Sequence, residues 1–486
     1  MSYLNNNVKI KDKYQCVIVG GGLGGLTMAG MLSLYGIEVL IVEKNPNLGG
    51  YVTDYRVGEY VFSHSIDWMS GLHDKGKFAV FLERLKLLDS VRYFHLEPFK
   101  RVITPDYNIP FNSDFDIFEE TLISNFPNEE HGIRQIVKII RSFGGPEWID
   151  YFRPFKNFEY LPFLKTFIKD ERLIAILSAN VNGNIPAYLF VLFLYRCLCK
   201  QAYILKDMTL TQLMDLIGTR LVEMGVAISA NSEVTDIQVE NNKVTGVRLA
   251  DGHVIKADCI ITDMDLLTVY NKYLPHGTIN NYFMNKLNSR DKSYSLISIF
   301  LGVNKKFDDC KITGEPTVYL PTYDIDDLYS DDPGKWHLKM NIRSIWQPFL
   351  APGGKSAVDI RALVKKDFFK KWLNDNNYRN DPEYLHLKDF ATEKLIQNSR
   401  LVLGEYLENI EEKRVATPLT LQRYTNNSCG SGMGWEVTPL EYLNGFRVTS
   451  PINNLFHVGA WASYPGIEGV VNYCMTLVSR IVKYYK

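Results

Sequence analysis

The chain has 486 residues, more than a typical single domain, so at least two domains around a large buried core are expected. Lysine and arginine number 54 and aspartate and glutamate 55; the resulting net charge of −1 argues against nucleic acid as a partner. The seven cysteines are scattered, and no pair has zinc-like or redox spacing, which predicts a reduced cytoplasmic protein without a metal site.

No apolar stretch of the sequence predicts a membrane span. The run at 187–199 is interrupted by Arg196 and is too short to cross a bilayer. Contact with a membrane surface or a carrier protein stays open, and so does the oligomeric state.

Residues 16–44 predict a nucleotide-binding unit. An apolar strand at 16–19 is followed by Gly20, Gly22 and Gly25 in G-x-G-x-x-G spacing, then by a helix over about 24–35 and a second strand at 39–42. These glycines permit a tight turn and close approach of the backbone to a pyrophosphate, whose charge the helix N-terminus stabilises. Glu43 ends the second strand, where a carboxylate accepts hydrogen bonds from a ribose diol.

Two further glycine segments favour FAD over a nicotinamide cofactor. Gly49 and Gly50 follow Glu43, and such a pair in flavoproteins runs along the FAD pyrophosphate. Near the C-terminus the order strand, Gly459, loop, Gly469 and helix supplies a second nucleotide-facing loop. Because a flavin is long enough to need this loop, we predict FAD as the cofactor.

Five segments carry a resemblance to a known group of flavoproteins. They are 20–50, 232–265, 344–355, 415–436 and 458–471. On these segments the chain resembles the phytoene desaturase, carotenoid isomerase and retinol saturase group, within the amine-oxidase-like superfamily. The resemblance covers nearly the whole chain. It implies an α/β fold with a Rossmann-type, glutathione-reductase-like FAD-binding domain, an inserted α+β substrate domain and a helical cap.

The resemblance also implies which residues bind FAD, with the backbone of Val234 holding the adenine. The expected cofactor-binding residues are Gly20, Gly22, Leu23, Gly24, Gly25, Glu43, Lys44, Gly49, Gly50, Tyr51, Val234, Gly459, Ala460, Ile467, Glu468, Gly469 and Val470. Tyr51 and Ala460 depart from the group, in which many members carry arginine and aspartate at these positions.

The predicted FAD-binding domain is discontinuous and consists of 12–90, 200–290 and 410–486, with 91–199 and 291–409 forming the substrate domain. Within the first domain, 226–262 alternates like a strand meander with turns at 241–242 and 251–252. In the second, strands are expected at 293–306, 315–321 and 337–346. Helices are expected over 114–200, with breaks near Gly144–Pro146, Pro162 and Pro186.

The helical insert is rich in aromatic residues between 151 and 199. Three explanations stay open: an ordinary core, the lining of an apolar tunnel, or contact with a membrane. An apolar small molecule is the expected substrate.

Three side chains are candidates for catalysis beside the flavin. His64 follows the second glycine pair, while Tyr464 and Glu468 lie in the expected ring-binding loop. A structural histidine, a packing tyrosine and a helix-start acid are the alternative interpretations. The backbone N–H groups of the last helix, from Ile467 to Val470, are expected to stabilise negative charge on reduced flavin.

The predicted function is an FAD-dependent oxidoreductase, a desaturase or saturase, that acts on carbon–carbon bonds of a long apolar substrate such as a carotenoid, polyene or isoprenoid. Three alternatives stay open: a non-redox polyene isomerase that uses reduced FAD, an amine oxidase-like enzyme, and a non-enzymatic prenyl or lipid escort protein.

Overall fold

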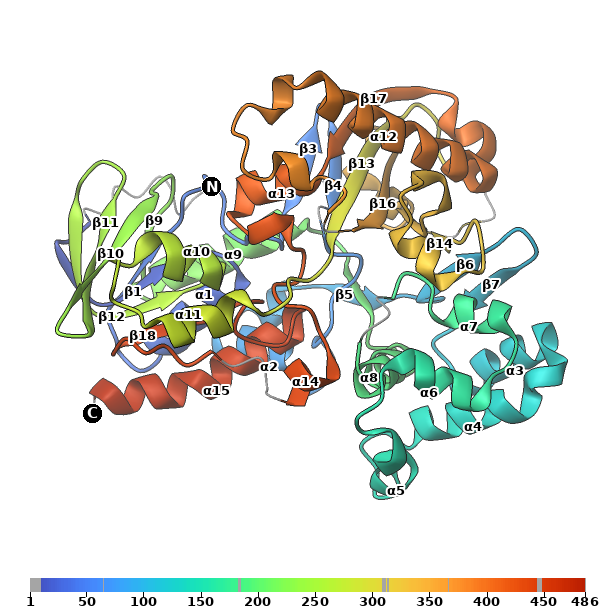
Figure 1. Cartoon of the computed structure of the whole chain (residues 1–486), viewed down its shortest axis with the longest axis horizontal. Coiled ribbons are helices and arrows are strands. Elements are labelled where there is room, and N and C mark those ends of the chain that lie inside the picture. Colours follow the sequence, from blue (N-terminus) through green and yellow to red (C-terminus); the bar gives the residue numbers. More distant parts are fainter. Residues whose placement is uncertain are drawn as a thin grey trace.

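The structure is a computed structural model that describes residues 10–485 apart from 64, 182–184, 308–311, 313, 366 and 444–447. Two seven-stranded sheets lie side by side, and a cluster of helices lies below the second sheet in Figure 1. The candidate His64 lies outside the described residues.

The first sheet is a Rossmann-type sheet assembled from distant parts of the chain. Its order is β10-β11-β12-β1-β2-β9, and β18 also pairs with β12. The pairs β12–β1, β1–β2, β2–β9 and β12–β18 are parallel, whereas β10, β11 and β12 form an antiparallel meander. The strands are β1 (Lys13–Val19), β2 (Val39–Val42), β9 (Ala227–Ser229), β10 (Val234–Glu240), β11 (Lys243–Leu249), β12 (Val254–Thr262) and β18 (Leu455–His457).

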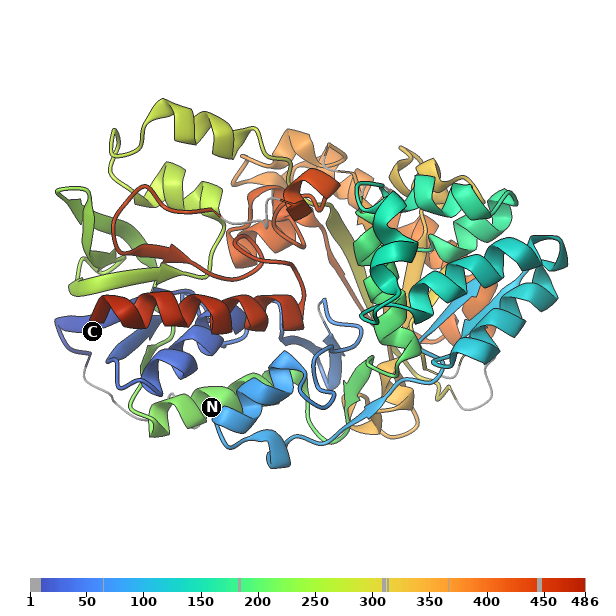
Figure 2. The same cartoon turned by 90° about the horizontal axis from the view of Figure 1, so that it is seen from below.

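Both faces of this sheet are buried, which explains the continuous apolar run in β1. Cys16 and Ile18 point into one core, while Val17 and Val19 point into the other, as the two-residue period of a strand requires. The first face is covered by α1 (Leu23–Ser33), α2 (Lys77–Arg84), α9 (Leu210–Glu223) and α15 (Ile467–Tyr485). Figure 2 shows α15 (red) next to the N-terminal strands and helix (blue), in keeping with its packing against α1. The other face is covered by α10 (Leu266–Thr268) and α11 (Asn281–Asn288).

The second sheet has the order β17-β13-β16-β15-β14-β6-β7 and is antiparallel except for β14–β6. Its strands are β6 (Lys100–Ile103), β7 (Asn108–Phe111), β13 (Ser295–Val303), β14 (Thr317–Tyr319), β15 (Leu338–Asn341), β16 (Ser356–Val364) and β17 (Ile410–Ala416). The helix α12 (Pro382–Leu403) packs on one face, and α13 (Pro418–Thr425) follows β17. Because β17 pairs with β13, residues 410–416 lie in this sheet and not with the Rossmann strands, so the domain boundary expected at 410 is displaced.

A hairpin from the N-terminal segment also packs on the second sheet. It consists of β3 (Asp54–Val57) and β4 (Tyr60–Ser63). The ring of Phe62 lies 5.4 Å from that of Phe300 in β13. The segment that carries the second glycine pair therefore runs from the first sheet to the second.

The helical cap consists of α3 (Phe115–Asn125), α4 (Glu130–Arg141), α5 (Trp148–Phe152), α6 (Tyr160–Phe167), α7 (Glu171–Leu177) and α8 (Ala187–Leu198). A two-stranded sheet of β5 (Tyr93–His95) and β8 (Tyr203–Leu205) joins it to the rest, and α14 (Pro439–Leu443) lies near the C-terminal loop. The expected breaks at 144–146 and Pro186 separate helices, as predicted. The break expected near Pro162 is present at 156–159, just before α6, and Pro162 itself lies in the first turn of that helix, where a missing N–H costs no helical bond.

The predicted fold class is confirmed by this arrangement of a Rossmann-type sheet, a second mixed sheet and a helical cap. Within the described ranges, no helix is both long and apolar enough to span a bilayer.

Candidate cofactor and active site

The first glycine unit forms a close-packed turn between β1 and α1. Gly20 has a φ of +105°, which favours glycine, and its N–H donates to Val42 O at 2.9 Å. A Cβ on Gly25 would lie 2.2 Å from Gly20 O, so a side chain there is excluded. Leu23 and Gly24 are buried in the first turn of α1. The start of α1 is thereby brought against the end of β1, as an anion-binding helix N-terminus requires.

The second glycine pair lies beside the first. Gly49 N–H donates to Gly21 O at 2.7 Å, and Gly49 forms an isolated parallel bridge with Gly22. Gly49 and Gly50 have φ values of +110° and +60°. The first glycine turn and the second glycine pair, both expected to bind the same pyrophosphate, are therefore adjacent.

Glu43 is buried at the end of β2, and backbone groups hold its carboxylate in place. Oε2 accepts from Gly21 N–H at 2.7 Å, and Oε1 accepts from Asn45 N–H at 2.8 Å. A carboxylate offers about four acceptor positions, so two remain for the hydroxyls of a ribose. Lys44, next in sequence, donates to Arg423 O at 3.3 Å, and burial lowers the pKa of Lys44.

Two other expected cofactor residues lie in contact with segments from elsewhere in the chain. Val234 begins β10, just after Ser232, whose N–H donates to Glu43 O at 2.9 Å. The Tyr51 hydroxyl donates to Ser431 O at 2.8 Å and accepts from Asn427 Nδ2 at 3.0 Å. Burial raises the pKa of Tyr51, so its hydroxyl stays neutral.

The C-terminal loop brings Gly459 and Ala460 to the same edge of the sheet. Gly459 N lies 2.8 Å from where a Cβ on Gly24 would stand, so the loop packs against the start of α1. In α15, Val470 N–H bonds to Gly466 O at 3.1 Å, while Ile467, Glu468 and Gly469 form the open first turn whose N–H groups precede the helical ladder.

Glu468 is engaged by the cap and by α2. Its Oε2 lies 2.8 Å from Arg196 Nη2 of α8, and its Oε1 accepts from Lys77 N–H at 3.3 Å. The Arg196 contact lacks hydrogen-bond alignment, so it acts as an ion pair. These contacts account for a buried acid here without a catalytic task, and the catalytic role of Glu468 stays a prediction.

Tyr464 forms one end of an aromatic chain that reaches the cap. Its hydroxyl donates to Tyr442 O at 3.2 Å, and its ring lies 5.3 Å from that of Tyr442. The Tyr442 ring in turn lies 5.0 Å from Tyr188 of α8. The ring-loop tyrosine is therefore in contact with the aromatic insert through one intervening residue.

Most of the insert's aromatic residues form an ordinary core. Tyr160, Phe163 and Phe190 are fully buried among the cap helices. A void of about 10 Å³ among α3, α4, α7 and α8 is too small for a ligand. Tyr188 and Phe193 of α8 are only partly buried, and Phe193 lies 5.8 Å from Trp68, beyond the cap.

A buried ionic network, which the sequence did not predict, joins the segment after β4 to the second sheet. Asp67 accepts from Arg361 Nη1 at 2.8 Å, from Asn341 Nδ2 at 2.9 Å and from Lys339 Nζ. Burial alone would raise the pKa of Asp67, but Lys339 and Arg361 hold it below its usual value. Charged residues inside the apolar strands 338–341 and 356–364 are the feature of the sequence that could have indicated this network.

Asp263 is a second residue that the sequence did not single out. It follows β12 as Glu43 follows β2, and its Oδ2 accepts from Gly25 N–H at 2.8 Å. For Glu43 and Asp263 alike, an acid directly after an apolar strand is the sequence feature that marks the residue.

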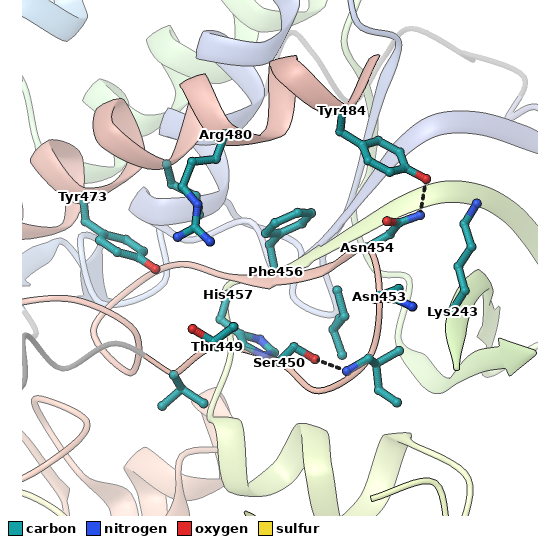
Figure 3. Close-up of a pocket in the computed structure, with 14 residues that line it drawn as sticks. Lys243, Thr449, Ser450, Asn453, Asn454, Phe456, His457, Tyr473, Arg480 and Tyr484 are labelled. Atoms are coloured by element: carbon teal, nitrogen blue, oxygen red, sulfur yellow. Dashed lines mark hydrogen bonds between the residues drawn. The ribbon is translucent and has the colours of Figure 1, made fainter. Parts of the chain in front are cut away.

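A pocket of about 550 Å³ lies away from all of these residues, between α15, β18 and the segment 448–454 (Figure 3). Arg480 and Tyr473 point toward it, and His457 lies on its wall. The His457 ring is fully used, because Nδ1 bonds to Thr262 Oγ1 at 2.8 Å and Nε2 to Tyr270 Oη at 2.7 Å. Burial lowers the pKa of His457 to about 3, so it is a neutral structural residue. None of the predicted cofactor residues lines this pocket.

The residues at the edge of the first sheet fit a dinucleotide. The start of α1 offers N–H groups to a pyrophosphate, and Glu43 offers acceptors to a ribose. Missing side chains at the glycines let the surrounding segments pack closely against this turn. Within the described residues no group of three or more histidines, cysteines or acids could hold a metal ion. The fold and this site define a Rossmann-type dinucleotide-binding protein.

Comparisons with known proteins show which group the chain resembles. Residues 18–85 match the NAD(P)-binding Rossmann-like domain. The chain is 24% identical over 517 residues to prolycopene isomerase 2, chloroplastic, of an Oncidium hybrid cultivar, covering 96% of this chain and 82% of that protein. It is 21% identical to phytoene desaturase (lycopene-forming) of Pseudescherichia vulneris, covering 96% and 99%. A solved oxidoreductase from Methanosarcina mazei shares the fold with a TM-score of 0.67 at 18% identity, covering 96% and 100%. The predicted resemblance to the carotenoid isomerase and phytoene desaturase group is confirmed.

Proposed function

We propose that the protein is an FAD-dependent oxidoreductase that acts on carbon–carbon bonds of a long apolar polyene or isoprenoid. The observation that carries the substrate class is the arrangement of α8. One face of this helix enters the cap core, while Tyr188 and Phe193 contact Tyr442 and Trp68 outside it. Rigid aromatic side chains of this kind bind an elongated apolar molecule without demanding polar partners.

The residues in place suit such a reaction. When bound, the flavin supplies hydride transfer to or from carbon. The start of α1 and Gly49 would hold the pyrophosphate, Glu43 the ribose, and the Val234 backbone the adenine. Backbone N–H groups at the start of α15 would stabilise negative charge, whereas Tyr464 would place an aromatic face between the ring loop and α8.

Non-redox isomerisation with reduced FAD is the second candidate, because the plant relative is named as an isomerase. Both candidates use the same apolar substrate and differ in whether an electron acceptor is consumed. Delivery of the substrate from a membrane surface or a carrier is part of the proposal, with the protein itself cytoplasmic.

The test begins with protein purified without added cofactor, whose extract is scanned for flavin and polyene absorbance. Activity is then measured on a polyene in liposomes, with and without a quinone acceptor, and on putrescine as a soluble amine. We expect bound FAD and conversion of the polyene; acceptor-independent conversion identifies the isomerase. Rapid peroxide-forming oxidation of putrescine would contradict the proposal, and protein that cannot be loaded with FAD would favour an escort role.

A further inference from the structure

The carboxylate of Asp263 occupies the position where an anion would meet α1. Because β12 pairs with β1 in parallel register, with Thr262 opposite Val19, the residue after β12 lies beside the glycine turn after β1. Asp263 N–H donates to Val19 O at 2.8 Å, which fixes the backbone, and Asp263 Oδ2 accepts from Gly25 N–H at 2.8 Å. One of the donors expected for a pyrophosphate is thus already bonded to the chain's own acid.

The first glycine turn and the C-terminal loop both pack against this carboxylate. A Cβ on Gly22 would lie 2.6 Å from Oδ2, and a Cβ on Gly459 would lie 2.0 Å from Oδ1. The Asp263 side chain therefore stands between the start of α1 and the C-terminal loop, the two segments expected to run along the phosphates.

Asp263 has no cationic partner among the described residues. In the described part of the chain no salt bridge joins it to a lysine, arginine or histidine, and the titratable groups that act on it or respond to it are Glu43 on β2 and Cys474 on α15. Burial raises the pKa of Asp263 to about 6, the Gly25 and Gly24 N–H groups lower it, and the Glu43 charge raises it further. Burial also raises the pKa of Cys474, which keeps that thiol neutral.

We propose that Asp263 gates dinucleotide binding: the site takes up the pyrophosphate together with one proton, which neutralises the Asp263 carboxyl. This inference rests on the proposed FAD cofactor. A pyrophosphate with two negative charges is repelled by the ionised Asp263 carboxylate, which has no cation beside it. The pyrophosphate and the carboxylate also compete for the N–H groups at the start of α1. The neutral carboxyl keeps its carbonyl oxygen for Gly25 N–H and gains an O–H that can donate to phosphate.

The direction of the pH dependence follows from proton uptake. Below the pKa of free Asp263, about 6, the carboxyl is already neutral and affinity is constant. Above it, each pH unit costs up to about ten-fold in affinity until the bound-state pKa is reached. Because Asp263 is partly exposed to solvent, the loss of affinity should be smaller than ten-fold per pH unit.

The experiment titrates apoprotein with FAD by flavin fluorescence between about pH 5.5 and pH 8.5. For the wild type we expect Kd to rise by about ten-fold or more between pH 6 and pH 8. Asp263→Asn has the shape of the neutral acid, so it should bind FAD tightly with a Kd that is constant within about three-fold. The control Asp258→Asn removes an acid of the same strand, paired with Lys13 at the surface, and should keep the wild-type slope.

A second measurement on the wild type does not depend on any variant's folding. Calorimetric titration with FAD near pH 7.5, in buffers of different ionisation enthalpy, should show uptake of close to one proton. A flat wild-type profile without proton uptake, or an equal slope in Asp263→Asn, would overturn the gate while leaving FAD as cofactor. Absence of FAD binding at every pH, in wild type and variants with normal thermal unfolding, would instead overturn the proposed cofactor and the gate with it.

Discussion

Arg196 of α8 and Glu468 at the start of α15 form an ion pair, with Nη2 and Oε2 2.8 Å apart. This contact connects the helical cap to the helix whose N-terminus is expected at the flavin. Since Glu468 also accepts from Lys77 N–H, the first turn of α15 is fixed to both α8 and α2.

The first prediction concerns this ion pair. We expect Glu468→Gln and Arg196→Met each to lower the free energy of unfolding by about 1–3 kcal/mol, because each leaves a largely buried charge or polar group without its partner. Both variants should retain FAD and turnover within several-fold. Denaturant unfolding and steady-state kinetics check this. If Glu468→Gln loses about a hundred-fold or more in turnover while Arg196→Met does not, Glu468 is the catalytic base.

Glu43 provides a direct test of the cofactor site. Glu43→Ala removes the carboxylate that would accept from ribose hydroxyls, and charge-assisted bonds of this kind contribute about 1.5–3 kcal/mol. FAD affinity should fall by about ten- to a hundred-fold, measured by fluorescence titration. Glu38→Ala is the matched control, since Glu38 is a surface acid paired with Lys11, and it should leave Kd unchanged. Equal affinity of the two variants would mean that Glu43 only supports the loop through Gly21 and Asn45.

The contact between Gly22 and Asp263 is testable by a double-mutant cycle. Gly22 has an ordinary φ of −72°, so alanine is allowed by the backbone, and the three atoms nearest its Cβ would all belong to the Asp263 carboxylate, with Oδ2 at 2.6 Å. We expect Gly22→Ala to destabilise the wild type by about 1–3 kcal/mol and to cost much less in an Asp263→Ala background. Chemical denaturation of the four proteins gives the coupling energy, and additive effects would contradict the observed proximity.

The network around Asp67 should be important for stability. Asp67→Asn leaves Lys339 and Arg361 without this counter-charge in a buried place, which should cost about 3–5 kcal/mol. Asp331→Asn, at an exposed acid 3.9 Å from Lys365, should change stability by less than about 0.5 kcal/mol.

The pH dependence of Asp67 has a definite sign. Its pKa is below the usual value in the folded protein, so its contribution is present above the unfolded-state pKa and is lost as pH falls through the folded-state pKa. The stability difference between wild type and Asp67→Asn should therefore shrink in acid; a difference that grows with acid would contradict the ion pairs described.

The elements of the first glycine unit could be predicted from the sequence because the residues that define them lie close together in the chain. The unit from β1 to Glu43 has strand, glycine and helix periods within about thirty residues, so the sequence alone located its elements closely. Pro162 marked the neighbouring break at 156–159, because proline is well tolerated in a first helical turn and so often follows a helix boundary closely. Domain boundaries were harder, since a strand such as β17 carries no sign of which sheet it joins.

The contacts between distant segments could not be derived from spacing. Asp263 meets Gly25 across 238 positions, and Asp67 meets Arg361 across 294. Only the folded chain shows that one acid stands at the helix N-terminus and that the other balances two cations. Each acid had a local signal, at a strand end or near charged strands, but a local signal names no partner.

The last segment of the chain completes the first sheet. β18 adds to β12, and α15 covers α1, although Cys474 of α15 and Gly24 of α1 are 450 positions apart. During synthesis the apolar face of α1 therefore stays uncovered until α15 has left the ribosome. A chain that stops before β18 would lack this cover and expose the α1 face to chaperones and proteases, so such a truncation should abolish accumulation of the protein, not merely its activity.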